Sequence, residues 1–219
     1  NVGEYRYPLG GKLYVFNKNE NIGFIKGHMC SPAIATQAEE LIAGGVKELI
    51  HVGYAGGLQP ELVPGEIILT DGAFNDTAVA RLYGYDYDII HSSKDLTNEI
   101  EEMITSAEIL YKRGLHWTTD AGYRETWGQV MDYRDKGALC VEMEGVGLFT
   151  IANYRKCVAT GIYVVSDKGT RYEIVGKGDV INTIEPKNQG LQTIIIYRQN
   201  EDGTWNYKNN VFRVGSELD

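Results

Sequence analysis

The sequence predicts a single α/β domain in which helices cover both faces of a central sheet. Several apolar runs of four to eight residues are typical of buried strands, and segments with helical spacing separate some of them. The chain has 219 residues, enough to bury a sizeable core, so we expect one domain over residues 1–219. Its 26 glycines against 5 prolines suit tight turns between strands and helices.

The predicted elements alternate along the chain. Apolar runs predict strands at Lys12–Phe16, Ile22–Ile25, Glu48–Val52, Glu66–Thr70, Ala138–Val141 and Ala159–Val165. Helical spacing predicts helices at Pro32–Ala43, which ends at Gly44-Gly45, at Leu96–Lys112, closed by Gly114, and after Glu144 through Ile151. Leu191–Tyr197 fits either a strand or a buried helix, and Asp202-Gly203 predicts a hairpin between Ile194–Tyr197 and Trp205–Tyr207.

Composition limits the partners that we expect. Thirty acidic against 21 basic residues give a net charge of -9, which would repel the backbone of a nucleic acid. No stretch approaches the ~18 apolar residues of a membrane span, and no signal peptide is apparent. The 3 cysteines are widely spaced without a CxxC, and the 4 histidines lack metal-binding spacing. These features favour a reducing cytoplasm and argue against a bound metal.

Two segments after predicted strands are rich in glycines or carboxylates. In His51–Leu58 the glycines let the backbone approach a ligand and offer N–H groups to an anion, although an ordinary turn has the same composition. Val141–Gly145 contains two carboxylates, which need partners if they are buried. A sugar diol is one such partner, because a carboxylate can accept two hydroxyl hydrogens. The alternative is acidic residues that stabilise the first turn of a helix.

Two further segments each have one functional and one purely structural explanation. Asp167 follows the apolar residues Tyr163–Val165, where it is well placed to act as a general acid, and a helix N-cap at Ser166 or Asp167 explains the same residues. Trp117–Thr126 mixes aromatic, charged and small residues as a site loop does, and a solvated loop has the same composition. The residues alone do not decide between these alternatives.

Taken together and in order, these segments resemble the purine-nucleoside and uridine phosphorylase family, which also contains the adenosylhomocysteine/methylthioadenosine nucleosidases. The resemblance covers about two thirds of the chain and rests on five stretches: Gly27–Pro32 followed by Glu39–Ile42, Gly53–Leu58 with Pro64–Glu66, Thr119-Asp120 with Tyr123, Val141–Glu144, and Val165–Asp167. It implies a phosphorylase/hydrolase-like fold with a central mixed sheet flanked by helices.

The resemblance also implies cleavage of the N-glycosidic bond of a nucleoside. Phosphorolysis to free base and ribose 1-phosphate is the expected reaction; hydrolysis and non-catalytic nucleoside binding are the alternatives. Asp167 would protonate the leaving base, ribose contacts are expected from Met29, Glu142, Met143 and Glu144, and base contacts from Ala55, Gly56, Gly122, Tyr123 and Arg124. No cofactor is implied beyond phosphate as co-substrate, and a homo-oligomer, either a dimer or a hexamer, is expected.

The phosphate half of the site departs from the family pattern. No Gly-Asp-Pro-x-Arg loop occurs, His51 stands where the family has an arginine, and Tyr54 replaces a small hydroxyl residue next to Gly53. A neutral imidazole supplies far less positive charge than a guanidinium. The sequence therefore predicts a complete sugar half, and a phosphate half that His51, Gly53 and Tyr54 would have to form.

Overall fold

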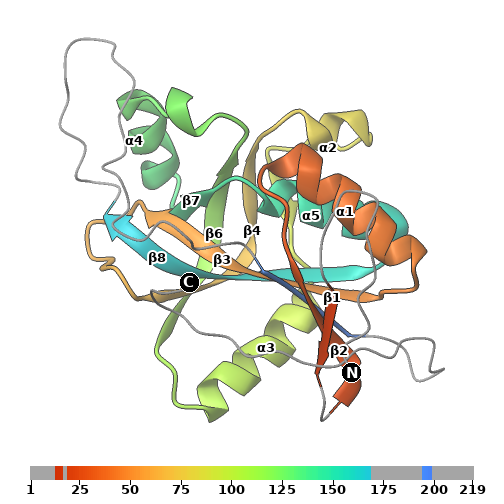
Figure 1. Ribbon diagram of the computed structural model, residues 1–219. Helices are drawn as coiled ribbons and strands as arrows, with labels where there is room; N and C mark the ends of the chain where they lie inside the picture. The colour runs from red at the N-terminus through yellow and green to blue at the C-terminus, as the bar shows by residue number, and fades with distance from the viewer. Residues whose placement is uncertain (1–12, 17–18, 169–193, 199–219) are drawn as a thin grey trace, which may run out of the picture.

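Helices lie on both sides of a mixed sheet in the computed structural model, which describes residues 13–16, 19–168 and 194–198 (Figure 1). Within these residues the strands are β1 Leu13–Phe16, β2 Asn19–Lys26, β3 Glu48–Gly57, β4 Ile67–Asp76, β5 Ile89–His91, β6 Tyr111–Thr119, β7 Cys140–Glu142, β8 Val158–Lys168 and β9 Ile194–Arg198. The helices are α1 Ser31–Ala43, α2 Val79–Leu82, α3 Lys94–Ser106, α4 Trp127–Asp135 and α5 Gly145–Arg155, with a 3₁₀ helix, η1, at Gly122–Arg124. The predicted α/β class with a central mixed sheet is confirmed.

Five strands of this sheet pair in a closed ring. The order around the ring is β3-β8-β4-β6-β7 and back to β3. The pairs β3–β8, β4–β6 and β6–β7 are parallel, and the pairs β8–β4 and β7–β3 are antiparallel. The carboxyl ends of β6 and β7 therefore lie at the opposite end of the ring from those of β3 and β8. Outside the ring, β9, β2 and β1 extend the sheet from β3, and β5 pairs with β4.

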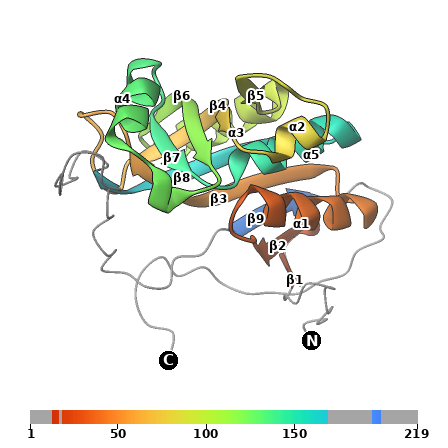
Figure 2. The same ribbon diagram turned by 90° about the horizontal axis from the view of Figure 1, so that it is seen from above.

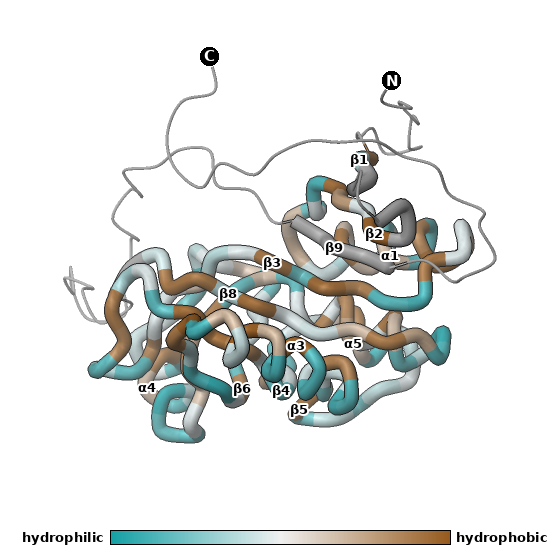
Figure 3. Tube along the Cα trace, turned by 90° about the horizontal axis from the view of Figure 1, so that it is seen from below, coloured by the Kyte–Doolittle hydropathy of each residue, from teal (hydrophilic) through white to brown (hydrophobic). Residues whose placement is uncertain are grey.

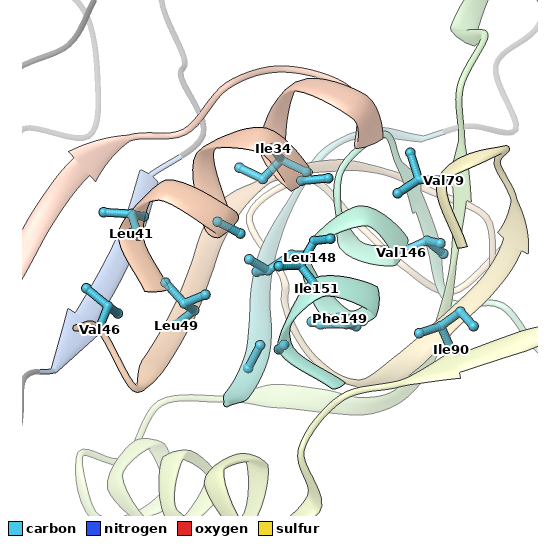
Figure 4. Packing of buried hydrophobic residues seen from close by; sticks show 14 of the residues in the cluster. Ile34, Leu41, Val46, Leu49, Val79, Ile90, Val146, Leu148, Phe149 and Ile151 are labelled. Carbon is cyan, nitrogen blue, oxygen red and sulfur yellow. The ribbon is translucent and has the colours of Figure 1, made fainter. Parts of the chain in front are cut away.

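The largest apolar cluster lies where α1 and α5 cover one side of the sheet (Figure 4). Ile34 and Leu41 of α1 and Leu148 and Ile151 of α5 are fully buried there with Leu49 of β3. Complete burial of each such side chain stabilises the fold by roughly 1.5–3 kcal/mol. α2 joins α1 and α5 on this side (Figure 2). The cluster thus fixes the starts of α1 and α5 relative to each other.

α3 covers the opposite side of the ring (Figure 1). Its buried residues Leu96, Ile100 and Ile104 pack against Ile50 of β3 and Leu69 of β4. Apolar residues follow β3 and β8 through the centre of the molecule, whereas hydrophilic residues occupy many of the outer turns (Figure 3). No helix in the described part of the chain is long and apolar enough to span a membrane.

Several predicted elements have different bounds in the structure, and two of these differences change the type of structure assigned to a segment. The predicted helix Leu96–Lys112 covers parts of two elements. Its first part belongs to α3, which ends at Ser106, and its last residues belong to β6, which starts at Tyr111. Glu108 between them has a φ of 56°, which ends the helix, and Gly114 lies inside β6 rather than at a helix end. The second difference is β3, which continues to Gly57, so the glycine-rich segment is the second half of a strand and not a turn.

The remaining predictions agree in kind with the elements found. The helix predicted at Pro32–Ala43 is α1, and the helix predicted after Glu144 is α5. Of the two alternatives for Leu191–Tyr197, the structure has a strand, β9, which pairs with β2 and β3. The hairpin predicted at Asp202-Gly203 lies outside the described residues.

Replacement of Gly147 by Ala is expected to destabilise the fold, because Gly147 lies where α5 meets the start of α1. A Cβ atom there would be 2.5 Å from the carbonyl oxygen of Ser31 and 3.0 Å from Cγ2 of Ile34. We expect Gly147→Ala to lower the free energy of unfolding by about 1–3 kcal/mol, measured by urea denaturation. Gly128→Ala on α4 is the matched control, since the nearest atom to its Cβ would be 4.0 Å away. Equal stability of the two variants would contradict the close approach of α1 and α5.

Candidate active site

The turn from β7 into α5 places the side chain of Glu144 beside the start of α1. Glu144 is the residue directly before α5, and its Oε1 accepts a hydrogen bond from the backbone N–H of Cys30 at 2.8 Å. Its Oε2 accepts a second from the N–H of Met143 at 3.3 Å. The hydroxyl of Ser31 donates to the carbonyl oxygen of Met143 at 3.0 Å. These contacts bring two of the five stretches of the family resemblance, Gly27–Pro32 and Val141–Glu144, into direct contact.

Glu142 faces the opposite way, into the interior of the ring, and is only 5% exposed. Its Oε1 accepts hydrogen bonds from Nε2 of His116 at 3.0 Å and from the hydroxyl of Thr118 at 2.5 Å. Its Oε2 accepts from the backbone N–H groups of Glu144 at 2.9 Å and Gly145 at 2.8 Å. All the hydrogen bonds of the Glu142 carboxylate are thus to groups inside the ring or at the start of α5, and the ribose contact expected of Glu142 stays a prediction.

Each of the five strands of the ring contributes a buried polar side chain to this interior: His51 from β3, Thr70 from β4, His116 from β6, Glu142 from β7 and Tyr163 from β8. Nδ1 of His51 is 3.1 Å from the hydroxyl of Tyr163, and Nδ1 of His116 is 2.6 Å from the hydroxyl of Thr70. Buried polar groups destabilise a protein unless they are paired. The ring therefore encloses a connected polar network centred on Glu142.

The surroundings move the pKa values of the two adjacent carboxyls in opposite directions. Burial, and then the negative charge of Glu142, raise the pKa of Glu144 to about 8. Burial also acts to raise the pKa of Glu142, but the charge of His116 and its hydrogen bond outweigh it and hold that pKa below its usual range. Glu142 is thus a fixed negative charge, whereas Glu144 changes its charge near neutral pH.

The residues predicted for phosphate do not provide a cation. His51 is 1% exposed, and burial lowers the pKa of its imidazole to about 4, with the charge of Glu142 opposing this only in part. It is therefore neutral at pH 7. His51 and Gly53 face the interior of the ring, and because side chains alternate along a strand, Tyr54 points to the other face. The side chains of His51 and Tyr54 therefore lie on opposite faces of β3, and the phosphate role of His51, Gly53 and Tyr54 stays a prediction.

The residues predicted to bind the sugar and the base lie around Glu144 to different degrees. Met29 precedes Cys30 and is 70% exposed. A Cβ atom on Gly122 would be 3.7 Å from Sδ of Met143. η1 therefore lies beside the turn Glu142–Glu144, called the acidic turn below. Tyr123 and Arg124 of η1 are exposed. Met29 is thus linked to Glu144 through the adjacent Cys30, and η1 through Met143.

The remaining predicted residues lie on β3 and β8. Ala55 is buried in the cluster that includes Tyr163 and Val165, and its carbonyl oxygen accepts a hydrogen bond from the hydroxyl of Ser166 at 3.3 Å. Gly56 pairs with Asp167 on one side and with Val141 on the other. The backbone register thus places Asp167 level with Val141 across β3. The side chain of Asp167 is not among the described groups.

Three contributors to the site were not assigned a role from the sequence, although Thr118 and Cys30 lie in the segments Trp117–Thr126 and Gly27–Pro32. His116 and Thr118 lie in β6, a strand that the sequence analysis did not identify, and a histidine between Leu115 and Trp117 was the available signal. Cys30 contributes only its backbone N–H, and its φ of 75° is unusual for a residue other than glycine. In the described part of the chain, no group of three or more His, Cys, Asp or Glu could hold a metal ion.

The fold is that of an α/β protein with a mixed sheet closed into a ring and a carboxylate-rich turn between β7 and α5. The family model of the phosphorylase superfamily matches residues 1–187, and the chain belongs to this family. The fold also resembles that of the P. knowlesi homologue of P. falciparum PNP, with a TM-score of 0.60 and 24% identity over 65% of this chain and 60% of that one. This likeness concerns the fold alone.

Curated relatives include bacterial enzymes named purine nucleoside phosphorylase DeoD-type. The protein from Exiguobacterium sibiricum is 33% identical over 139 residues, which is 62% of this chain and 59% of the relative. The protein from Caldanaerobacter subterraneus subsp. tengcongensis is 33% identical over 156 residues, 66% of this chain and 67% of the relative. The chain thus spans less than two thirds of the length of the first of these relatives.

Replacement of Cys30 by Gly is expected to stabilise the protein. Cys30 has a φ of 75° and a ψ of 149°, a region that is almost restricted to glycine and that strains other residues by about 1–3 kcal/mol. Glycine removes this strain and keeps the N–H that binds Glu144, while the greater freedom of the unfolded chain offsets ~0.5–1 kcal/mol. We expect Cys30→Gly to unfold at higher urea concentration than the wild type, and Cys30→Ala, which keeps the strain, not to do so. A less stable glycine variant would contradict the strained backbone.

The stability difference between Glu144→Gln and the wild type is expected to depend on pH. The pKa of Glu144 is about 8 in the folded protein, against a usual value of 4.5. The folded state therefore retains a proton that the unfolded chain loses, and stability from this group, complete below pH 4.5, is lost as pH rises to about 8. Glutamine cannot ionise, so the variant should gain relative to the wild type across this range. Urea denaturation at several pH values measures the gain, and a constant difference would contradict the raised pKa.

Proposed function

We propose that this protein cleaves the N-glycosidic bond of a purine nucleoside by phosphorolysis and releases the free base and ribose 1-phosphate. The observation that carries the proposal is the position of Glu144, which lies between the starts of α1 and α5 with both oxygens held by backbone N–H groups. Membership of the phosphorylase superfamily and the names of the curated relatives support the reaction and the purine base.

The proposed chemistry uses Glu144 in its ionised form. Its carboxylate accepts hydrogen bonds from the 2′- and 3′-hydroxyls of the ribose and holds the sugar in one orientation. Cleavage passes through a sugar with oxocarbenium character, so a nearby carboxylate also stabilises the developing positive charge. Met143, next to Glu144, packs on the ribose, and Met29 covers the sugar from the α1 side.

The base and its leaving proton are assigned to the other predicted residues. Gly122, Tyr123 and Arg124 of η1 border the base, because Gly122 lies beside Met143. Asp167 protonates the departing purine as a general acid, which makes the base a better leaving group. Its support is the backbone register, which places Asp167 next to Gly56 at the end of β8.

Hydrolysis is the second candidate, and one observation favours it. The imidazole of His51 is buried and neutral, since burial lowers its pKa to about 4, whereas phosphate binding needs positive charge. Water as the nucleophile has no such need. A nucleosidase would keep the same ribose contacts and the same general acid.

Two broader assignments accompany this proposal. Cys30, Cys140 and Cys157 are free thiols, which supports an enzyme of the reducing cytoplasm. A homo-oligomer stays a prediction from the family resemblance. Exposed aromatic side chains such as Tyr87 and Tyr123 are compatible with an interface between subunits.

A base-release assay tests the proposal and separates the candidates. The protein is incubated with inosine, adenosine, uridine or methylthioadenosine, with and without phosphate, and the free base is measured. We expect release of purine only with phosphate. Release without phosphate would establish the hydrolase instead, and no release from any nucleoside would contradict both. Asp167→Asn should bind inosine and lose turnover; turnover within about tenfold of the wild type would exclude Asp167 as the acid.

A further inference from the structure

We propose that Glu142 and His116 are positioning residues that hold Glu144 for the ribose diol and thereby set the preference for ribonucleosides over 2′-deoxynucleosides. This inference rests on the proposed function, in which Glu144 binds the two hydroxyls. Neither Glu142 nor His116 touches the sugar, since both are buried inside the ring. Their effect passes through the backbone of the turn between β7 and α5.

Glu142 provides the acceptors for the start of α5. The first N–H groups of a helix have no partners within the helix, and Glu144, the residue before α5, makes no side-chain cap hydrogen bond. Instead, Oε2 of Glu142 accepts from the N–H groups of Glu144 at 2.9 Å and Gly145 at 2.8 Å. The backbone of Glu144 is thus fixed from inside the ring, while its carboxylate is fixed by the N–H of Cys30 from outside.

His116 in turn fixes Glu142. Nε2 of His116 is 3.0 Å from Oε1 of Glu142, and Nδ1 is 2.6 Å from the hydroxyl of Thr70. That hydroxyl also accepts a hydrogen bond from the backbone N–H of Gly72 at 3.0 Å. The imidazole is therefore held at both ring nitrogens, by Glu142 on one side and by Thr70 on the other. Thr118 adds a neutral donor to the same oxygen of Glu142.

Gly145 matches this pair sterically. A Cβ atom at position 145 would be 2.5 Å from Nε2 of His116 and 3.1 Å from Oε1 of Glu142. A side chain there would push His116 away from Glu142 at the point where their hydrogen bond forms. Gly145 thus offers a way to disturb the pair without removing either side chain.

The charge of Glu142 has a second effect on Glu144. The negative charge of Glu142 opposes ionisation of the Glu144 carboxyl, and so does the burial of Glu144; both raise the pKa of Glu144. Five titratable groups face the carboxyls of Glu142 and Glu144. They are Cys30 before α1, His51 of β3, His116 of β6, Cys140 of β7 and Tyr163 of β8. Of these groups, His116 has the largest effect on Glu142, which it holds in the charged form.

The consequence for substrate preference follows from the number of hydroxyls. A ribonucleoside offers the 2′- and 3′-hydroxyls to Glu144, whereas a 2′-deoxynucleoside offers only the 3′-hydroxyl. Both contacts form only when the carboxylate keeps its position and orientation. Displacement of Glu144 therefore reduces kcat/KM for inosine more than for 2′-deoxyinosine, and general loss of stability reduces both alike.

The experiment compares kcat/KM and Kd for inosine and 2′-deoxyinosine in the wild type, Glu144→Gln, Glu142→Gln and Gly145→Ala. Thr160→Val is the matched control, because it removes a buried 2.7 Å hydrogen bond, to Thr97 of α3, outside the ring interior. We expect a preference for inosine in the wild type that falls at least about tenfold in Glu144→Gln, Glu142→Gln and Gly145→Ala, and is unchanged in Thr160→Val. A tenfold change corresponds to ~1.4 kcal/mol.

The pH profile provides the second measurement. In Glu142→Gln the charge that opposes ionisation of Glu144 is gone, so the acid limb of kcat/KM for inosine should move to lower pH, while Thr160→Val leaves it in place. An unchanged preference in Glu142→Gln and Gly145→Ala, when Glu144→Gln loses it, would overturn this inference alone. An equal preference in the wild type and Glu144→Gln would overturn the ribose role of Glu144. Absence of both binding and cleavage would overturn the proposed function.

Discussion

The carboxylate of Glu142 is the group on which the rest of the site depends. It accepts hydrogen bonds from His116 and Thr118 and from the backbone of Glu144 and Gly145, and so joins β6, β7 and the start of α5 at one point. A buried carboxylate is tolerated only when its charge is compensated and its oxygens are occupied. Glu142 meets both conditions within the ring, and the backbone groups that satisfy it are those that position its neighbour, Glu144.

The closed ring explains why such a group can exist in this fold. An open sheet has two faces, which helices cover with apolar residues, whereas a ring encloses an interior, which here is contacted by the start of α5. Here each strand contributes a polar residue to that interior, and apolar contacts with α1, α5 and α3 lie outside it. The ring also brings β6 and β7 to the end where α1 begins, so the Glu144 carboxylate meets the N–H of Cys30.

The sequence allowed the α/β class, α1, α5 and the acidic turn to be predicted, because each depends on local pattern: apolar spacing, a glycine stop, or carboxylates after a strand. It did not allow the orientation of Glu142 and Glu144 to be predicted. Adjacent carboxylates in a turn look equivalent, and only the long-range partners, His116 for one and Cys30 for the other, separate them. β6 was hidden because the amphipathic helix α3 precedes it with only a short turn between, so that the two formed one apparent helical run.

The polar interior also bears on how phosphate can enter the site. Nδ1 of His51 lies 4.0 Å from Oε2 of Glu142, so an anion bound to the His51 ring on the inner side would face a fixed negative charge. Two like charges repel each other more strongly in such a buried interior than in water. The neutral state of His51 offers nothing to offset that repulsion. A phosphate used by this protein must therefore be held outside the ring by other cationic groups, whereas a water nucleophile meets no such electrostatic constraint.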